Sequence, residues 1–346
     1  MTVEEICAIR LCRQHLTAPA DRLTVVRDLC GLQAQFTVNV RHALAIRCGE
    51  PLDGHFGAGL VKNWTLRGTV HAFAACDLPL FKHGSARYRS RDWSDYRPYS
   101  SGETRLSAEQ HCRWADFILA QVEAGNGERE ALKAACAAHG MTRDEMDCIF
   151  DAWGGGMREL CERGFLNYAV EEKKVFVCCP PFVPMETPDA EREMMRRYLA
   201  HYAPATLRDM AYFFGWPQAK CRAILGELPH QSETVDGRQY FWSDALPDAP
   251  AVSRCLFLAG FDPLMLGYRK EDNPFLPPEH LRGIFNLAGI VMPAILFDGR
   301  VIGRWKYKQG RLTATCFAMA EPHVRTALAD AAEQFFPDLR RLDFAD

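Results

Sequence analysis

Two glutamines separated by one residue are the side chains of this sequence whose type and spacing best suit chemistry. Gln33 and Gln35 flank Ala34 at the end of a segment with helical apolar spacing. An amide has no accessible pKa, but its carbonyl dipole can hold a water molecule and face a developing positive charge. Residues i and i+2 cannot share one face of a regular helix. We therefore expect the pair at an irregular helix end or turn. The simpler interpretation is a polar helix end satisfied by water or backbone groups.

The bulk composition is that of an ordinary globular protein with a slightly negative charge. The 346 residues are 48% hydrophobic and 25% charged, and the length fits two or three domains. The formal net charge of −3 argues mildly against a nucleic-acid partner, because nucleic-acid-binding proteins usually carry a basic surplus. A local basic groove is still compatible with this value, since net charge says nothing about the distribution of charge.

Targeting segments and cysteine frameworks are not indicated. No run approaches the roughly 18–20 apolar residues of a membrane helix, and the first five residues, MTVEE, are acidic where a secretory signal is basic. We expect a cytoplasmic protein. The 14 cysteines are scattered without a C-x-x-C pair, so their spacing predicts neither a disulfide framework nor a structural zinc site. We expect most of them to be small buried apolar side chains.

Helices followed by a short β-hairpin recur three times, which is the pattern of a winged helix. In the first unit, helical spacing at residues 6–16 and 23–32 precedes an alternating β-branched run at 64–73. The later repeats contain a capping box at Thr142, and an N-cap at Thr206 for a helix that ends at Gly215. The three predicted winged-helix units span residues 1–105, 106–188 and 189–248.

The last part of the chain, residues 249–346, has a different texture. Pro, Gly and alternating apolar residues dominate, and Asp298-Gly299 between two β-branched runs is a strong hairpin signal. One helix, residues 322–335, is expected near the end. The predicted fold class is therefore α+β, with three tandem winged-helix units and a small C-terminal β-barrel-like domain.

Three motifs carry a resemblance that spans nearly the whole chain. They are Gly31-Leu-Gln-Ala-Gln35, Leu66-Arg-Gly-Thr-Val-His71 and Phe261-Asp-Pro-Leu-Met-Leu-Gly-Tyr-Arg269, the last followed by related runs at 289–293 and 298–305. Together they resemble the tandem winged-helix DNA glycosylases, the group that includes AlkZ and YcaQ. The resemblance implies a DNA-binding channel and makes the Gln-x-Gln pair the catalytic motif. The Lys270-Glu-Asp272 run departs from the Asp-Arg that tends to follow in the family.

The resemblance implies a monofunctional DNA glycosylase, with water held by Gln33 and Gln35 as the nucleophile. Two amides are weak catalysts, so the base that they help to remove should be a good leaving group. A cationic alkylated purine of the N7-alkylguanine type is one, with bulky adducts or interstrand crosslinks as further candidates. The motif holds no lysine for the Schiff base of a lyase. No metal or organic cofactor is implied, the expected partner is double-stranded DNA containing alkylated purines, and a monomer is expected.

Further DNA contacts are expected outside the catalytic pair. Arg67 is a candidate for a phosphate and His71 for the lesion, on a hairpin that enters a groove; the alternative is a packed strand arginine and a core histidine. The stretch 87–97, which ends at Arg97, mixes arginines with aromatic rings and suits a backbone-tracking surface, or is simply a solvated loop. The full set of predicted DNA-binding residues is Arg41, Arg67, His71, Arg87, Arg89, Arg91, Asp262, Tyr268 and Arg269.

Two interpretations from other functional classes stay open. A non-enzymatic winged-helix DNA-binding protein or regulator would bind undamaged duplex in a sequence-specific manner and release no base. A catalytically silent member of the group acting as a scaffold would suit the mild acidity. A basic channel converging on Gln35 would favour the enzyme.

Overall fold

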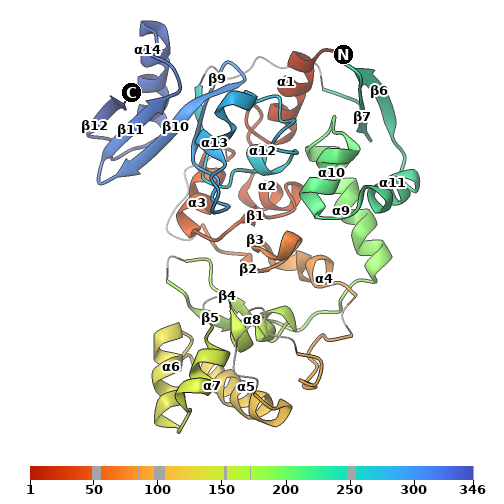
Figure 1. The fold of residues 1–346 in the computed structure, drawn as a ribbon, viewed down its shortest axis with the longest axis vertical. Helices are drawn as coiled ribbons and strands as arrows, with labels where there is room; N and C mark the ends of the chain where they lie inside the picture. The colour runs from red at the N-terminus through yellow and green to blue at the C-terminus, as the bar shows by residue number, and fades with distance from the viewer. Residues whose placement is uncertain are drawn as a thin grey trace. The chain divides into compact units, whose positions relative to one another are not determined.

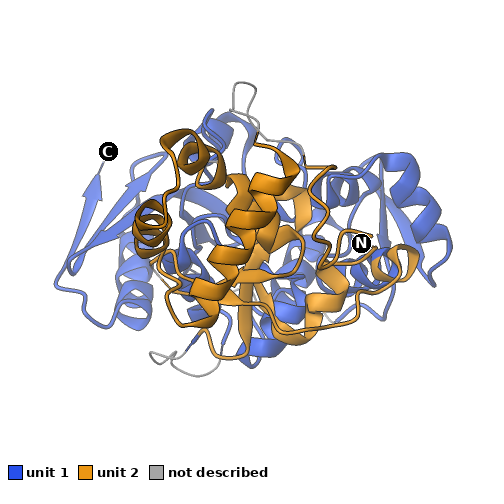
Figure 2. Ribbon diagram, turned by 90° about the horizontal axis from the view of Figure 1, so that it is seen from below, with its two compact units in different colours: residues 1–56, 191–346 blue, residues 57–190 orange. Residues whose placement is uncertain are grey.

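The computed structural model of the protein describes residues 1–48, 56–84, 86–96, 106–151, 154–171, 173–247 and 255–345. The chain forms two compact units (Figure 2). Unit 1 consists of residues 1–56 and 191–346, and unit 2 consists of residues 57–190. The sequence of unit 2 is thus inserted into that of unit 1. The predicted first domain, residues 1–105, falls in both units.

Nine α-helices of the described residues lie wholly or mostly in unit 1 (Figure 1). They are α1 (Val3–Arg13), α2 (Arg22–Asp28), α3 (Thr37–Ala45), α9 (Thr187–His201), α10 (Leu207–Phe214), α11 (Gln218–Gly226), α12 (Pro263–Leu266), α13 (Leu281–Ile284) and α14 (Pro322–Phe335), with a short 3-10 helix at Pro278–His280. The helix predicted for residues 23–32 is shorter than expected, because Cys30 and Gly31 have left-handed backbones with φ of 55° and 85°. The chain then becomes extended in β1 (Leu32–Gln33).

Three helices and a hairpin follow one another in the second part of unit 1. Helices α9, α10 and α11 precede the antiparallel strands β6 (Gln231–Val235) and β7 (Arg238–Trp242). Thr206 caps α10 in a capping box with Asp209, and Gly215 ends the helix with a left-handed φ of 71°. Both signals are confirmed, and the order of elements is the one predicted for residues 189–248. Its assignment as a winged helix stays a prediction.

The C-terminal part of unit 1 is an open five-stranded sheet. Its order is β12-β11-β10-β9-β8, and α14 covers one face through a core that includes Leu312 and Leu328. The turn at Asp298-Gly299 joins β9 to β10 as predicted. Because β12 and β8 remain at opposite edges, the predicted barrel-like closure is wrong for this sheet. The strands are β8 (Cys255–Phe257), β9 (Ala294–Phe297), β10 (Arg300–Lys308), β11 (Arg311–Cys316) and β12 (Arg341–Ala345).

Unit 2 combines a small antiparallel sheet with helices. Strands β3, β2, β4 and β5 are neighbours in that order, and the helices build a core around Trp114 and Ile118. The capping box at Thr142 is confirmed. The elements are β2 (Leu60–Trp64), β3 (Val70–Ala74), α4 (Leu78–Phe81), α5 (Ala108–Glu123), α6 (Arg129–Ala138), α7 (Arg143–Ile149), α8 (Gly155–Glu162), β4 (Leu166–Tyr168) and β5 (Phe176–Cys178), with 3-10 turns at Leu66–Gly68 and Ala75–Asp77.

The fold class is α+β, as predicted. All 14 cysteines are free thiols, and several of them are buried. Among the described residues, no helix has both the length and the hydropathy needed to cross a membrane.

Candidate active site

The Gln-x-Gln motif lies in an extended segment between two helices of unit 1. Its middle residue, Ala34, is fully buried, Gln33 is half-buried and Gln35 is exposed. Side chains alternate between faces in extended backbone, so this burial pattern indicates that the two amides share the outward face. The motif is therefore outside a regular helix, as expected, but in an extended link rather than a helix end. Within the described ranges neither amide has a hydrogen-bond partner in the protein, which leaves both available for a ligand.

Helix α3 begins directly after the motif. Its N-cap residue, Phe36, makes no side-chain cap, so the positive end of the helix dipole lies beside Gln35. Phe36 is 47% exposed and Val38 56% exposed, which makes an apolar rim next to the amides. Arg41 lies one turn further along α3 and is exposed, with its guanidinium 5.8 Å from the ring centre of Phe56. Of the predicted DNA-binding residues, Arg41 is the one whose position next to the glutamines fits a phosphate contact.

Asp262 has a structural position rather than an exposed one. It is fully buried and forms a bidentate ion pair with Arg47, with N–O distances of 2.7 and 3.0 Å. Arg47 lies just beyond the C-terminus of α3. The same carboxylate caps α12 by accepting from the backbone N–H of Leu264 at 2.9 Å. Its burial and its internal hydrogen bonds do not favour the DNA contact expected of Asp262, which stays a prediction. Its role is to fix α3, and with it the motif, on the body of unit 1.

Tyr268 is likewise part of the interior. Its hydroxyl donates to the backbone oxygen of Tyr202 at 3.0 Å and accepts from the side-chain amide of Gln14 at 2.8 Å. The guanidinium of Arg10 lies 3.8 Å from the centre of its ring. Burial raises the pKa of Tyr268 well above its usual value. No part of the side chain reaches solvent, which does not favour the DNA contact expected of Tyr268; that contact stays a prediction.

Arg269 belongs to a cluster of three arginines around Asp272. The sequence does not indicate this cluster. Arg208 of α10, Arg238 of β7 and Arg269 all lie within 3.7 Å of the carboxylate of Asp272. The arginine side chains are 38–47% exposed and the side chain of Asp272 is 16% exposed. Three guanidinium groups at the surface therefore share one largely buried carboxylate. Arg269 also pairs with Glu271. This arrangement keeps Arg269 as a candidate for a phosphate and adds Arg208 and Arg238. Sequence spacing gives no signal for the cluster, because its members are far apart along the chain.

The predicted hairpin of unit 2 forms, but its histidine points inward. His71 on β3 is buried, and its Nδ1 lies 2.8 Å from the hydroxyl of Thr65. Burial, together with the positive charge of Arg67, lowers the pKa of His71 to about 3. Arg67 is half-buried in the turn with a φ of 56°. The core-histidine interpretation therefore describes His71 better than a contact with a lesion. The phosphate contact of Arg67 stays a prediction.

The buried neutral His71 gives unit 2 a predictable pH dependence. Its folded pKa lies below its unfolded value near 6.5, so the unfolded chain binds more protons between those values and stability falls as the pH drops from 6.5. One such group costs about 2 kcal/mol between pH 6.5 and 5. We expect the His71→Gln variant to lose less Tm between pH 7.5 and 5 than the wild type. The control is the His139→Gln variant, because His139 is exposed. If Tm falls equally with pH in the wild type and both variants, the pH dependence does not come from His71.

The arginine stretch of unit 2 is engaged in internal contacts. Arg87 bridges Asp95 and Glu159, Arg89 donates to the backbone oxygen of Cys179 at 2.7 Å, and Arg91 pairs with Asp116. A phosphate would have to compete with these acceptors. DNA binding by Arg87, Arg89 and Arg91 stays a prediction, and Arg97 lies outside the described residues.

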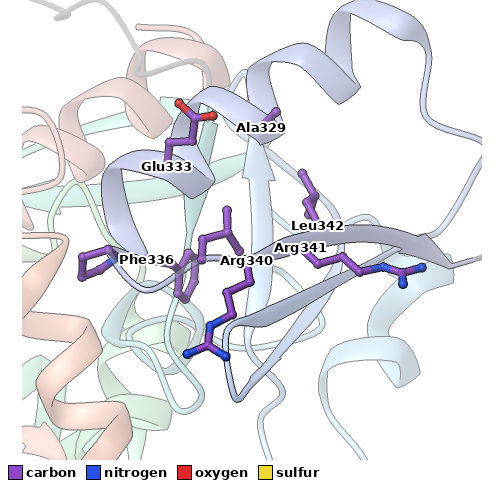
Figure 3. Close-up of a pocket in the computed structure, with 8 residues that line it drawn as sticks. Ala329, Glu333, Phe336, Arg340, Arg341 and Leu342 are labelled. Carbon is purple, nitrogen blue, oxygen red and sulfur yellow. The ribbon is translucent and has the colours of Figure 1, made fainter.

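Two cavities of unit 1 are lined by residues other than the glutamines. One of about 500 Å³ lies between α14 and β12, and Figure 3 shows Glu333, Phe336 and Arg340 around it. A second, of about 770 Å³, is lined by residues of α14 and by the segment around Leu16. Neither cavity is lined by Gln33 or Gln35. The exposed Gln35 fits a site on an open surface better than one inside either of these cavities.

Comparison with known proteins places the chain in a family. The family model for AlkZ-like DNA glycosylases matches residues 26–336, a span that includes both glutamines. The interstrand DNA cross-link repair glycosylase of Streptomyces sahachiroi is 25% identical over 342 residues, covering 92% of this chain and 91% of the relative. The solved structure of Streptomyces sahachiroi DNA glycosylase AlkZ matches with a TM-score of 0.76 at 23% identity, over 100% of this chain and 99% of that chain, and so shows the shared fold. The chain belongs to the AlkZ-like family of DNA glycosylases.

Proposed function

We propose that this DNA glycosylase removes cationic alkylated purines from double-stranded DNA, with Gln33 and Gln35 holding the attacking water. The observation that carries the proposal is the state of the two amides. They flank a fully buried alanine, face outward and have no partner among the described residues, in a chain of this family. Buried polar side chains normally have a partner in the protein, whereas these two amides face solvent and can bind water or a ligand.

The chemistry suits amides and not a strong base. As the base leaves, positive charge builds on the sugar, and a fixed carbonyl dipole that faces this charge stabilises it. The same groups can orient the water that attacks the sugar. Since an amide cannot take up a proton, the departing base must leave without much assistance. An N7-alkylguanine does so because it already carries a positive charge.

The size of the adduct is the second part of the proposal. Gln35 lies on the surface, and neither of the two cavities of unit 1 described above is built around it. A bulky N7 adduct or an interstrand crosslink is hard to enclose in a tight pocket, and an open site accepts it more easily. The name of the Streptomyces sahachiroi relative, an interstrand DNA cross-link repair glycosylase, supports this part of the proposal.

The direct test is base release from defined duplexes. One duplex carries N7-methylguanine, a second a bulky N7 adduct, and a third uracil; the free base is measured by mass spectrometry beside an enzyme-free sample, because N7 adducts also depart spontaneously. We expect release from the first two duplexes and none from the uracil duplex. Robust excision of uracil would contradict the proposal, because a neutral base needs acid assistance that amides do not supply.

Arg41 provides a test of how unit 1 binds the DNA backbone. Loss of one phosphate contact should lower the slope of log K against log salt by about 1 and weaken binding equally for damaged and undamaged duplex. We expect both effects in Arg41→Ala, measured by fluorescence anisotropy at several salt concentrations. The Arg41→Lys variant keeps the charge and should keep the slope. If both variants match the wild type, Arg41 does not touch a phosphate.

A non-enzymatic DNA-binding protein is the alternative function. The exposed arginines around Asp272, next to the β6–β7 hairpin, are the observation in its favour, since they suit backbone contacts whether or not a base is released. This alternative predicts tight, sequence-specific binding to undamaged duplex and no free base from any of the three substrates.

A further inference from the structure

A half-buried group of two histidines and one aspartate lies in unit 1, at the end of the helix that precedes the Gln-x-Gln motif. His15 follows the C-cap residue of α1, Asp28 is the last residue of α2 and His201 is the last residue of α9. The Nε2 of His15 lies 2.9 Å from Oδ2 of Asp28, and the Nε2 of His201 lies 3.3 Å from Oδ1. The potential ligand atoms of the three residues all lie within 4.8 Å of one another.

The hydrogen bonds of His201 do not balance for a neutral ring. Its Nε2 faces the carboxylate of Asp28, and its Nδ1 lies 3.3 Å from the backbone oxygen of Arg13. Both neighbours are acceptors only, whereas a neutral imidazole has a single N–H. With the proton on Nδ1, a lone pair of Nε2 points at a carboxylate. A protonated ring, with an N–H on each nitrogen, removes this conflict, and so does a cation placed between the ring and the carboxylate.

The donor set is one that zinc accepts. Imidazole nitrogen and carboxylate oxygen both bind Zn²⁺ at about 2.0–2.2 Å, and three protein ligands leave a fourth position for water. The contact from Nδ1 of His201 to the Arg13 carbonyl is the kind of outer contact that fixes the tautomer of a metal-bound histidine. His15 has a left-handed φ of 60° at a helix end, where glycine is the usual residue. A histidine there costs some conformational energy, which a role for its side chain would explain.

We propose that His15, Asp28 and His201 form a Zn²⁺ site that clips together the ends of α1, α2 and α9. Asp28 precedes the turn that leads into Gln33, so the ion would fix the start of the catalytic segment. The chain directly after α9 already contacts the end of α2, because the hydroxyl of Tyr202 donates to the backbone oxygen of Leu29, the C-cap residue of α2, at 2.9 Å. The ion would hold these three segments together, with water as its fourth ligand, and metal binding does not depend on the proposed catalysis.

The test uses the full chain, purified without a histidine tag and treated with a chelator. Zinc stoichiometry is measured by equilibrium dialysis and elemental analysis, and Tm is measured with and without ZnCl₂. We expect one equivalent of zinc more in the wild type than in His15→Gln or His201→Gln. At 100 times Kd the ion should raise the folded-to-unfolded ratio about 100-fold, which corresponds to a Tm rise of roughly 3–6 °C. The variants should show no such rise.

Two controls separate this site from other causes. Glutamine can still donate to Asp28, so the variants remove a metal ligand while keeping a hydrogen bond, and His230→Gln, on the same unit but exposed, should bind zinc like the wild type. Substitution with Co²⁺ distinguishes imidazole and carboxylate ligands from the free thiols, because thiolate ligation adds an intense charge-transfer band. Equal zinc content in the wild type and both histidine variants, or a thiolate spectrum, would overturn the proposal.

Discussion

Replacing Gln35 by alanine should lower the rate of base excision by about 100- to 1,000-fold, the usual effect of removing one preorganised polar group from a reaction centre. Stability should not change, since the side chain is exposed and has no protein partner among the described residues. The measurement is single-turnover release of N7-methylguanine from duplex DNA, with Tm and DNA affinity recorded on the same samples. Gln33→Ala should act in the same direction.

The matched control for this prediction is Gln218→Ala. Gln218 is an exposed glutamine at the start of α11, and its loss should change neither rate nor Tm. A Gln35→Ala protein that binds damaged DNA normally but releases base slowly supports a role in the chemical step. Normal release would show that the water is held by other groups.

Removing the carboxylate of Asp262 should produce the largest loss of stability predicted for this protein. Asp262 and Arg47 are both fully buried and paired at 2.7 and 3.0 Å, so Asp262→Ala leaves a guanidinium without its counter-ion in the interior. Breaking such a pair from one side costs about 3–5 kcal/mol. The measurement is urea unfolding followed by circular dichroism. Excision activity should fall with it, because Arg47 lies just beyond the helix that follows the glutamines.

An exposed ion pair on the same unit is the control for Asp262. Glu227 pairs with Arg192 at 3.1 Å, and both side chains are at least 40% exposed. Glu227→Ala should therefore cost about 0–1 kcal/mol. If the two variants lose the same free energy of unfolding, burial does not make loss of the Asp262–Arg47 pair more costly than loss of an exposed pair.

Local signals in the sequence predict local structure well. The capping box at Thr142, the N-cap at Thr206, the helix end at Gly215 and the Asp298-Gly299 turn each depend on a few adjacent residues, and all are confirmed. Helix α14 was also predictable, because its apolar spacing is regular. The early end of α2 was not, since it depends on Cys30 adopting a left-handed backbone that residues other than glycine seldom take.

Contacts between distant residues explain most of what the sequence could not predict. The motif locates the two glutamines, but nothing near Asp262 indicates that its partner is Arg47, 215 residues away. A charged or aromatic residue in a family motif was therefore interpreted as a DNA contact, although Asp262 and Tyr268 hold the fold together. The sequence gives no sign of the group formed by His15, Asp28 and His201 either, because the three residues lie at the ends of different helices and only the fold brings them together. The open edge of β12 is a further case, as closure of a sheet is a tertiary property.

The insertion of unit 2 within unit 1 has a consequence for the newly made protein. Translation proceeds at about 5–20 residues per second. Because 215 residues separate Arg47 from Asp262, Asp262 is synthesised roughly 10–40 s after Arg47. Unit 2 is continuous and can fold during this interval. The segment that carries the two amides gains its support only late in synthesis. We therefore expect a chain that ends before Asp262 to release no base, because Arg47 lacks its counter-ion there.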